Sequence, residues 1–118
     1  MTPSTPTPDE RRALSRTLRL LDLFRSVDPN MPLGAAVGFL SIASRSETSV
    51  SDLKEVGISR SPATYHAKYL GEHHDRNGRP GKGLVSSCLS MTDRRRRMLS
   101  LTSKGELLAT QIENVLAP

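Results

Sequence analysis

Residues 92–105 read TDRRRRMLSLTSKG, and they place four consecutive arginines directly before a stretch in which apolar and polar residues alternate. The alternation over residues 96–101 predicts a strand with Leu99 and Leu101 on one face. The preceding LVSSCLSM, residues 84–91, predicts a partner strand, and TDRR predicts the turn between them. The sequence therefore predicts a β-hairpin whose tip is strongly positive.

The four arginines of this tip all have the same sign of charge. A tip that only had to stay solvated could mix both signs, whereas a polyanion offsets the repulsion, because phosphates exchange condensed counterions for Lys and Arg. A narrow minor groove also attracts inserted arginine. Asp93 precedes Arg95 by two residues and could orient its guanidinium group. We expect a DNA-contacting tip made by Asp93, Arg94, Arg95 and Arg96; a merely solvated tip is the alternative.

A helix-turn-helix pattern lies upstream, in SVSDLKEVGISRSPATYHAKYLG, residues 49–71. Ser49 can cap a short helix, with Asp52 three residues further on at the capping-box spacing. Gly57 then allows a tight turn, and the apolar Ile58 fills it. The pattern thus predicts two helices that cross closely.

The second of these helices opens at Ser59 or Ser61. Its inward face is predicted to consist of small and apolar residues: Ala63, Ala67 and Leu70. Its outward face is polar, cationic and aromatic, and Tyr69 lies at its border. We expect the outward residues to contact DNA; they are Arg60, Ser61, Thr64, Tyr65, His66 and Lys68.

Two further helices are predicted before the helix-turn-helix. Residues 8–27 form an amphipathic helix, because apolar residues recur at helical spacing: Leu14, Leu18, Leu21 and Phe24. Thr7 and Glu10 have the capping-box spacing at its start. This helix is either an ordinary core helix or one that also packs on a second subunit. Asn30 and Pro32 can start another helix that runs to about Ser44.

A last helix follows the hairpin. Ser103 and Glu106 have the capping-box spacing, and the apolar residues Leu108, Ile112 and Val115 extend the helix to about residue 116. The expected fold class is therefore α+β, mainly α: a winged helix-turn-helix with a two-stranded β wing between N- and C-terminal helices.

The hairpin and the start of the last helix resemble a known family signature. Asp93-Arg94-Arg95, then Leu99-Ser100-Leu101-Thr102-Ser103-Lys104-Gly105, is similar to the Asp-x-Arg and Leu-Thr-x-x-Gly wing motif of the MarR (multiple antibiotic resistance regulator) family. The resemblance covers roughly residues 32–116. It implies a homodimer on a pseudo-palindromic DNA site, with each recognition helix in a major groove and each wing arginine in a neighbouring minor groove.

The resemblance also implies residue roles. Arg95 takes the role of the wing arginine, and Asp93 that of its orienting partner. The first and last helices would pack together in the dimer, which gives an expected interface of Leu14, Leu18, Leu21, Leu108, Ile112 and Val115. The segment 71–83 is longer than the usual family connection.

Length and composition fit this interpretation. The 118 residues suffice for one domain of ~100–200 residues; we expect a disordered tail at 1–6 and a single winged-helix domain at 7–118. With two Phe, two Tyr and no Trp, the core is small, and dimerisation would bury more apolar surface. The net charge of +5 favours an anionic partner.

Other kinds of site find less support. His73 and His74 are adjacent in a loop and do not converge on one metal ion, so we expect no metal site. The same loop offers Arg76, Arg79 and Lys82, which either approach phosphate or are simply solvated. We expect Cys88 to be a packed small hydrophobe rather than a redox sensor.

The sequence shows no set of residues typical of an enzyme, and we expect neither catalysis nor a cofactor. No apolar run is long enough for a membrane span and no signal peptide is evident, so a cytoplasmic protein is expected. The predicted function is a homodimeric transcriptional repressor. The alternatives are a plasmid or phage replication or partition protein and a winged-helix module that binds an acidic protein. No small-molecule effector is identified.

Overall fold

The computed structural model describes residues 7–45, 48–71, 80–92 and 96–117, apart from the side chains of Glu10, Arg60 and Ser61. The helices are α1 (Pro8–Val27), α2 (Leu33–Ala43), the 3-10 helix η1 (Val50–Val56), α3 (Arg60–Leu70) and α4 (Ser103–Leu116); the strands are β1 (Thr48–Ser49), β2 (Val85–Leu89) and β3 (Arg97–Leu101). This order confirms the predicted winged helix-turn-helix. The predicted boundaries of the first and last helices and of the hairpin strands agree with it to within about two residues.

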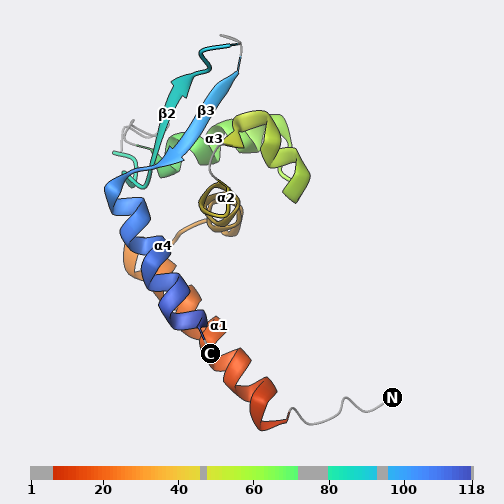
Figure 1. The fold of residues 1–118 in the computed structure, drawn as a ribbon, viewed down its shortest axis with the longest axis vertical. Coiled ribbons are helices and arrows are strands. Elements are labelled where there is room, and N and C mark those ends of the chain that lie inside the picture. The colour runs from red at the N-terminus through yellow and green to blue at the C-terminus, as the bar shows by residue number, and fades with distance from the viewer. Residues whose placement is uncertain (1–6, 46–47, 72–79, 93–95, 118) are drawn as a thin grey trace.

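Helices α1 and α4 lie side by side and run in opposite directions, and the first turns of α1 extend beyond the end of α4 (Figure 1). Pro8 is the first residue of α1, where its fixed φ suits a helix and its missing N–H is not needed. The N-cap of α4 is Thr102, whose hydroxyl accepts a hydrogen bond from Gly105 N at 3.1 Å. The predicted cap at Ser103 is therefore wrong by one residue.

The core lies where α2 meets the other elements. Phe39 of α2 is fully buried, and its ring makes an edge contact with Phe24 of α1 at 5.8 Å between centroids. Leu53, Leu70 and Leu99 come from η1, α3 and β3 and are each 1% exposed. The helix-turn-helix and the base of the hairpin thus share one core.

The sheet has three antiparallel strands in the order β1-β3-β2. In the predicted hairpin, Val85 pairs with Leu101 and Leu89 with Arg97. The sequence did not predict β1, which adds Thr48 and Ser49 to the other edge of β3, opposite Leu99 and Met98. This short strand joins the wing to the start of η1.

The molecule is elongated, with extents of 51 × 27 × 26 Å. We call α1 and α4 the stalk, and α2, η1, α3 and the sheet the head. Figure 1 shows the hairpin at the end of the head farthest from the start of α1. Among the described residues, no helix is both long and apolar enough to cross a membrane.

The stalk shows how far the residues of the predicted dimer interface are buried within one chain, while the interface itself stays a prediction. Leu108 and Ile112 of α4 are only 5% exposed, because α4 folds back on α1 and uses this stripe within its own chain. Val115 is half-buried. Leu14, Leu18 and Leu21 on α1 are exposed, as predicted for residues that could meet a partner, and so are two leucines of α4 that were not predicted: Leu107 and Leu116.

Candidate nucleic-acid interface

The turn of the helix-turn-helix forms as its residues predict. Ser49 Oγ accepts from Asp52 N at 3.2 Å, and Asp52 Oδ2 accepts from Ser49 N at 2.9 Å, which completes the predicted capping box. Gly57 has a φ of 83°, a left-handed conformation that glycine adopts without strain. Ile58 is buried behind the turn, and its N–H donates to Leu53 O at 3.1 Å. These contacts fix how α3 leaves η1.

The outer face of α3 is polar and accessible. Thr64, Tyr65 and Lys68 are exposed, and Tyr65 retains 40% of its surface. The backbone of Arg60 and Ser61 forms the first turn of α3. Ala63 and Leu70 are buried on the opposite face, as predicted, and Ala67 is half-buried. The helix thus offers hydrogen-bonding groups of the kind that recognise base edges.

His66 does not belong to this outer face. It is half-buried, and its ring lies against Gly34 of α2 so closely that a Cβ on Gly34 would come within 2.5 Å of His66 Nε2. Its Nδ1 is buried without a hydrogen-bond partner among the described residues. Burial lowers the pKa of His66 and so favours the neutral ring at pH 7. The predicted outward position of His66 is therefore wrong, because the helix crossing covers it.

Tyr69 also points inward, at 7% exposure. Its hydroxyl donates to Asp28 Oδ2, just after α1, while Lys82 Nζ lies 3.5 Å from the same oxygen and 5.5 Å from the centre of the Tyr69 ring. The Tyr69 hydroxyl, then the N–H of Asn30, and then Lys82 lower the pKa of Asp28. We call Asp28, Tyr69 and Lys82 the inner tie. Lys82, expected either to approach phosphate or to be solvated, lies beside Asp28 and Tyr69 instead.

The hairpin strands of the wing carry polar side chains on both faces. Ser86 and Ser100 pair through their hydroxyls at 3.1 Å, and Arg97 NH1 donates to Ser87 Oγ at 3.1 Å. Cys88 is exposed, so the prediction of a packed thiol is wrong: only the base of the hairpin is covered by the core. The predicted tip residues lie outside the described residues; they are Asp93, Arg94 and Arg95. The same holds for the loop residues His73, His74, Arg76 and Arg79.

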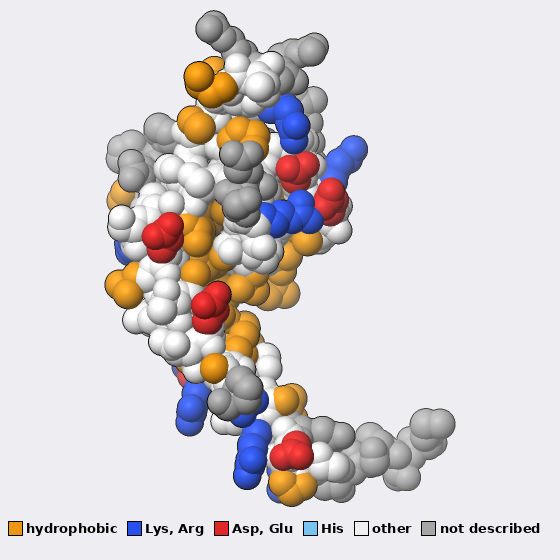
Figure 2. All heavy atoms as spheres, viewed as in Figure 1, with side chains coloured by type: hydrophobic (Ala, Val, Ile, Leu, Met, Phe, Trp, Pro, Cys, Tyr) orange, Lys and Arg blue, Asp and Glu red, His pale blue; other side chains and the backbone are white. Residues whose placement is uncertain are grey.

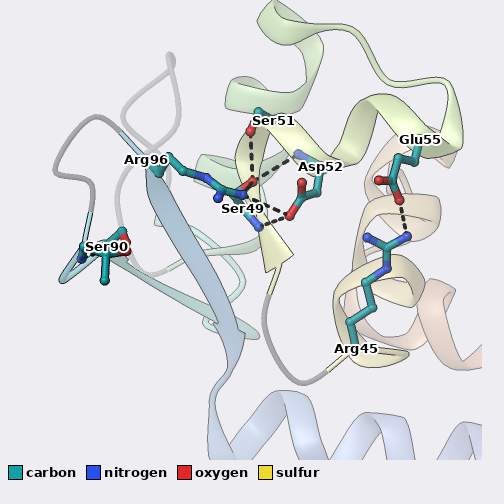
Figure 3. Close-up of polar contacts among 8 residues, drawn as sticks. Arg45, Ser49, Ser51, Asp52, Glu55, Ser90 and Arg96 are labelled. Carbon is teal, nitrogen blue, oxygen red and sulfur yellow. Dashed lines mark hydrogen bonds and ion pairs between the residues drawn. The ribbon is translucent and has the colours of Figure 1, made fainter.

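Arg96 stands at the base of the tip and reaches away from it. Its NH2 donates to Ser49 Oγ at 3.1 Å and lies 3.6 Å from Asp52 Oδ2 (Figure 3). The pKa of Asp52 is lowered, first by the Ser49 N–H and hydroxyl, and then by the positive charge of Arg96. We call Arg96, Ser49 and Asp52 the outer tie. The sequence predicted the cap formed by Ser49 and Asp52, but no local pattern indicates its contact with Arg96.

Apolar and charged side chains both lie on the surface of the molecule. Figure 2 shows apolar side chains along the stalk and where the stalk meets the head, with Lys and Arg beside them. Within the described part of the chain, no three His, Cys, Asp or Glu side chains are grouped as metal ligands.

Several solved structures are similar to this chain. A cysteine-to-serine mutant of MarR from E. coli has a TM-score of 0.64 and 16% identity, over 98% of this chain and 79% of that one. The same mutant complexed with operator DNA has a TM-score of 0.60 and 17% identity, over 91% of this chain and 72% of that one. NadR in complex with 4-hydroxyphenylacetate has a TM-score of 0.60 and 22% identity, over 98% of this chain and 78% of that one. No protein-family model matches the sequence, and no curated protein does.

These likenesses extend over nearly the whole chain, so they include the stalk as well as the head. At this level of identity they establish the fold alone. The chain has the MarR-like winged-helix fold that the wing signature predicted.

Proposed function

We propose that this protein is a sequence-specific DNA-binding transcriptional regulator that acts as a homodimeric repressor. The observation that supports it most is the exposed polar face of α3 beside a cationic hairpin, on a fold shared with a MarR mutant that was solved on operator DNA. The net charge of +5 favours the same anionic partner.

In this proposal the two parts of the head have different tasks. Thr64, Tyr65 and Lys68, with Arg60 and Ser61, contact base edges in the major groove. Arg94 and Arg95 at the wing tip, with Arg76 and Arg79 in the loop, contact phosphates or the minor groove. Base contacts give specificity, and phosphate contacts give position and affinity.

The stalk provides the reason to propose a dimer. Leu14 and Leu18 are each 61% exposed and Leu21 is 48% exposed, at spacings that put them on one face of α1. Leu107 and Leu116 of α4 add to the exposed apolar surface. Burying a leucine stabilises by about 1.5–3 kcal/mol, so a second copy that covers this face gains substantially. Two copies would read the two halves of a pseudo-palindrome.

Repression needs nothing more than occupancy of a promoter. A dimer that binds its site tightly excludes other proteins from it, and the described elements are all used by the stalk and the head. Steric repression is therefore the mechanism that we propose.

Selection of bound duplexes from sheared genomic DNA, at physiological salt, tests the proposal. We expect an enriched inverted repeat, and we expect Lys68→Ala and Arg95→Ala each to weaken its binding by about 1–3 kcal/mol. Lys104→Ala, which removes the same charge at the start of α4, is the control for net charge. Binding without an enriched sequence, abolished by moderate salt, would contradict the proposal and favour an acidic protein partner. Cooperative binding to tandem repeats would favour a replication or partition protein.

A further inference from the structure

Arg96 and Arg97 differ in what their side chains contact. Its backbone O accepts from Ser90 N at 2.8 Å, so the residue closes the hairpin, but its guanidinium leaves the hairpin and reaches Ser49 and Asp52. Arg97, the next residue, remains within the hairpin and donates to Ser87. Of these two arginines, Arg96 alone connects the wing to the helix-turn-helix.

The two acceptors of Arg96 are also held by hydrogen bonds that do not involve Arg96. Ser49 is 1% exposed, and its hydroxyl is fixed by Asp52 N at 3.2 Å and by Ser51 Oγ at 2.9 Å. The carboxylate of Asp52 is fixed by Ser49 N at 2.9 Å. A side chain that docks on such preorganised groups loses its own freedom without disturbing theirs. Figure 3 shows the guanidinium lying against this cap.

We propose that Arg96 is a positioning residue that sets the angle between the wing and the recognition helix, and that it is not a phosphate contact. This inference rests on the proposed function and revises the sequence-based assignment of Arg96 to the DNA-contacting set. Because α3 is attached to η1 through the tight turn at Gly57, a link from η1 to the wing fixes the major-groove reader relative to the minor-groove reader. Two other links join the wing to the helix-turn-helix: β1, which is only two residues long, and the backbone hydrogen bonds between the end of α3 and the residues before β2, among them Leu84 N to Leu70 O at 2.8 Å. The latter lie at the base of the hairpin, whereas Arg96 acts at the end near the tip.

The negative charge of Asp52 helps to distinguish a positioning role of Arg96 from a phosphate contact, because the two roles predict opposite changes in DNA affinity when Asp52 is replaced. Removing an acidic group near a DNA-binding surface normally strengthens binding to a polyanion, because repulsion is lost. If Asp52 serves to hold Arg96, its removal weakens binding to the specific site instead. The same reasoning separates charge from geometry at Arg96, since lysine keeps the charge but lacks the planar fork that spans two acceptors.

The test measures affinity for the enriched site and for an unrelated duplex of equal length, over a range of salt concentrations. For Arg96→Lys and Arg96→Gln we expect about a tenfold loss on the specific site, the scale of one charged hydrogen bond, with little change on the unrelated duplex or in the salt dependence. Arg97→Gln, which removes the same charge from the next residue, should weaken both duplexes alike. Asp52→Asn should weaken specific binding and leave Arg96→Gln with little further effect.

Three outcomes would overturn the inference. One is equal weakening on both duplexes by Arg96→Gln, with a salt slope lower by about one per subunit. The second is wild-type behaviour of Arg96→Lys. The third is tighter specific binding by Asp52→Asn. Because Asp52 also caps η1, the thermal unfolding of the Asp52→Asn variant is measured as well. If this variant is unfolded, Arg96→Lys and Arg96→Gln alone decide whether Arg96 has the positioning role.

Failure of the proposed function is visible separately, as wild-type protein that prefers no DNA sequence. The positioning role is then decided without DNA, by amide hydrogen exchange. Arg96→Gln should speed exchange at Thr48, in the β1–β3 pairing, and at Ser49, whose N–H donates to Asp52 Oδ2, and leave β2 unchanged. Unchanged exchange at β1 would overturn the inference.

Discussion

The head and the stalk differ in how their surfaces are completed. In the head, the inner tie at Tyr69 and the outer tie at Arg96 pair polar side chains from distant elements of the chain, although Thr48 Oγ1 and His66 Nδ1 are buried without a partner among the described residues. In the stalk, by contrast, leucines at regular spacing remain exposed, with Leu14 and Leu18 each at 61%. The difference teaches that polar contacts within one chain hold the elements of the head together, whereas the exposed leucines of the stalk are the surface that the proposed dimer would cover.

The largest expected effect is at the stalk. Leu18→Glu puts a charge on the exposed stripe of both copies, and the loss of two buried leucines should weaken the dimer by about 3–6 kcal/mol. Sedimentation equilibrium measures this as a shift from dimer to monomer. Leu89→Glu changes an equally apolar, 52% exposed residue in the wing and should leave the dimer intact. A Leu18→Glu protein that stays dimeric would remove the distinction between stalk and head.

The junction of stalk and head gives the next effect. Gly105 in the first turn of α4 lies against Leu84 O, and a Cβ there would overlap that backbone atom. Gly105→Ala should therefore lower the free energy of unfolding by about 3 kcal/mol, the scale of an overpacked core. Urea denaturation measures it.

Gly38→Ala is the matched control for this change. A Cβ at Gly38 meets Ile58 Cδ1 at an ordinary 3.8 Å, and alanine is the better helix former by up to about 1 kcal/mol. We expect this variant to be slightly stabilised. If both variants were equally destabilised, the close approach of Gly105 to Leu84 O would not be the reason for a glycine at this position.

The inner tie gives a smaller effect. Tyr69→Phe removes the hydrogen bond to Asp28 and leaves that carboxylate with Asn30 and Lys82, so the free energy of unfolding should fall by about 1–2 kcal/mol. Thermal unfolding measures it. Tyr65→Phe makes the same change on the exposed face of α3 and should cost almost nothing. A Tyr69→Phe protein as stable as wild type would show that the tie adds no stability to the head.

Local signals predicted most of the head. The alternation at Leu99 and Leu101, the cap at Ser49 and the glycine at Gly57 each act within a few residues, so the hairpin and the helix-turn-helix follow from the sequence. The predicted roles of Arg95 and Lys68 on DNA stay predictions.

Contacts between distant elements account for what sequence reasoning missed. His66 and Tyr69 lie on the predicted helix, but their inward orientation depends on where α2 and Asp28 are. The helical spacing that includes Leu108 suits either a partner subunit or the core of the same chain. Only the fold shows that Leu108 is buried within its own chain. A two-residue strand such as β1 is too short to produce any periodicity.

The smallest effect is the pH dependence of the inner tie. The pKa of Asp28 is below its ordinary value of 3.8, first because the Tyr69 hydroxyl donates to it. A lowered folded-state pKa means that the charged carboxylate stabilises the fold above about pH 4, and that this contribution is lost as the pH falls through the folded-state pKa. The stability difference between wild type and Asp28→Asn should therefore shrink below pH 4, as followed by urea denaturation. Asp9→Asn, an exposed carboxylate near the start of α1, controls for the lost charge. A difference that stays constant with pH would contradict this account.

The antiparallel pairing of α1 with α4 also determines the order in which the protein can fold during synthesis. The ribosome makes α1 before every other element, whereas α4, which covers its inner stripe, follows only after the whole head. Contacts between segments so distant in the chain form slowly, because a long loop closes first. The helix-turn-helix has local contacts and can fold before α4 is made. At that stage the apolar residues of α1 that α4 covers are still exposed to water. Nascent chains of this protein should therefore depend on chaperones for the first helix rather than for the DNA-reading part.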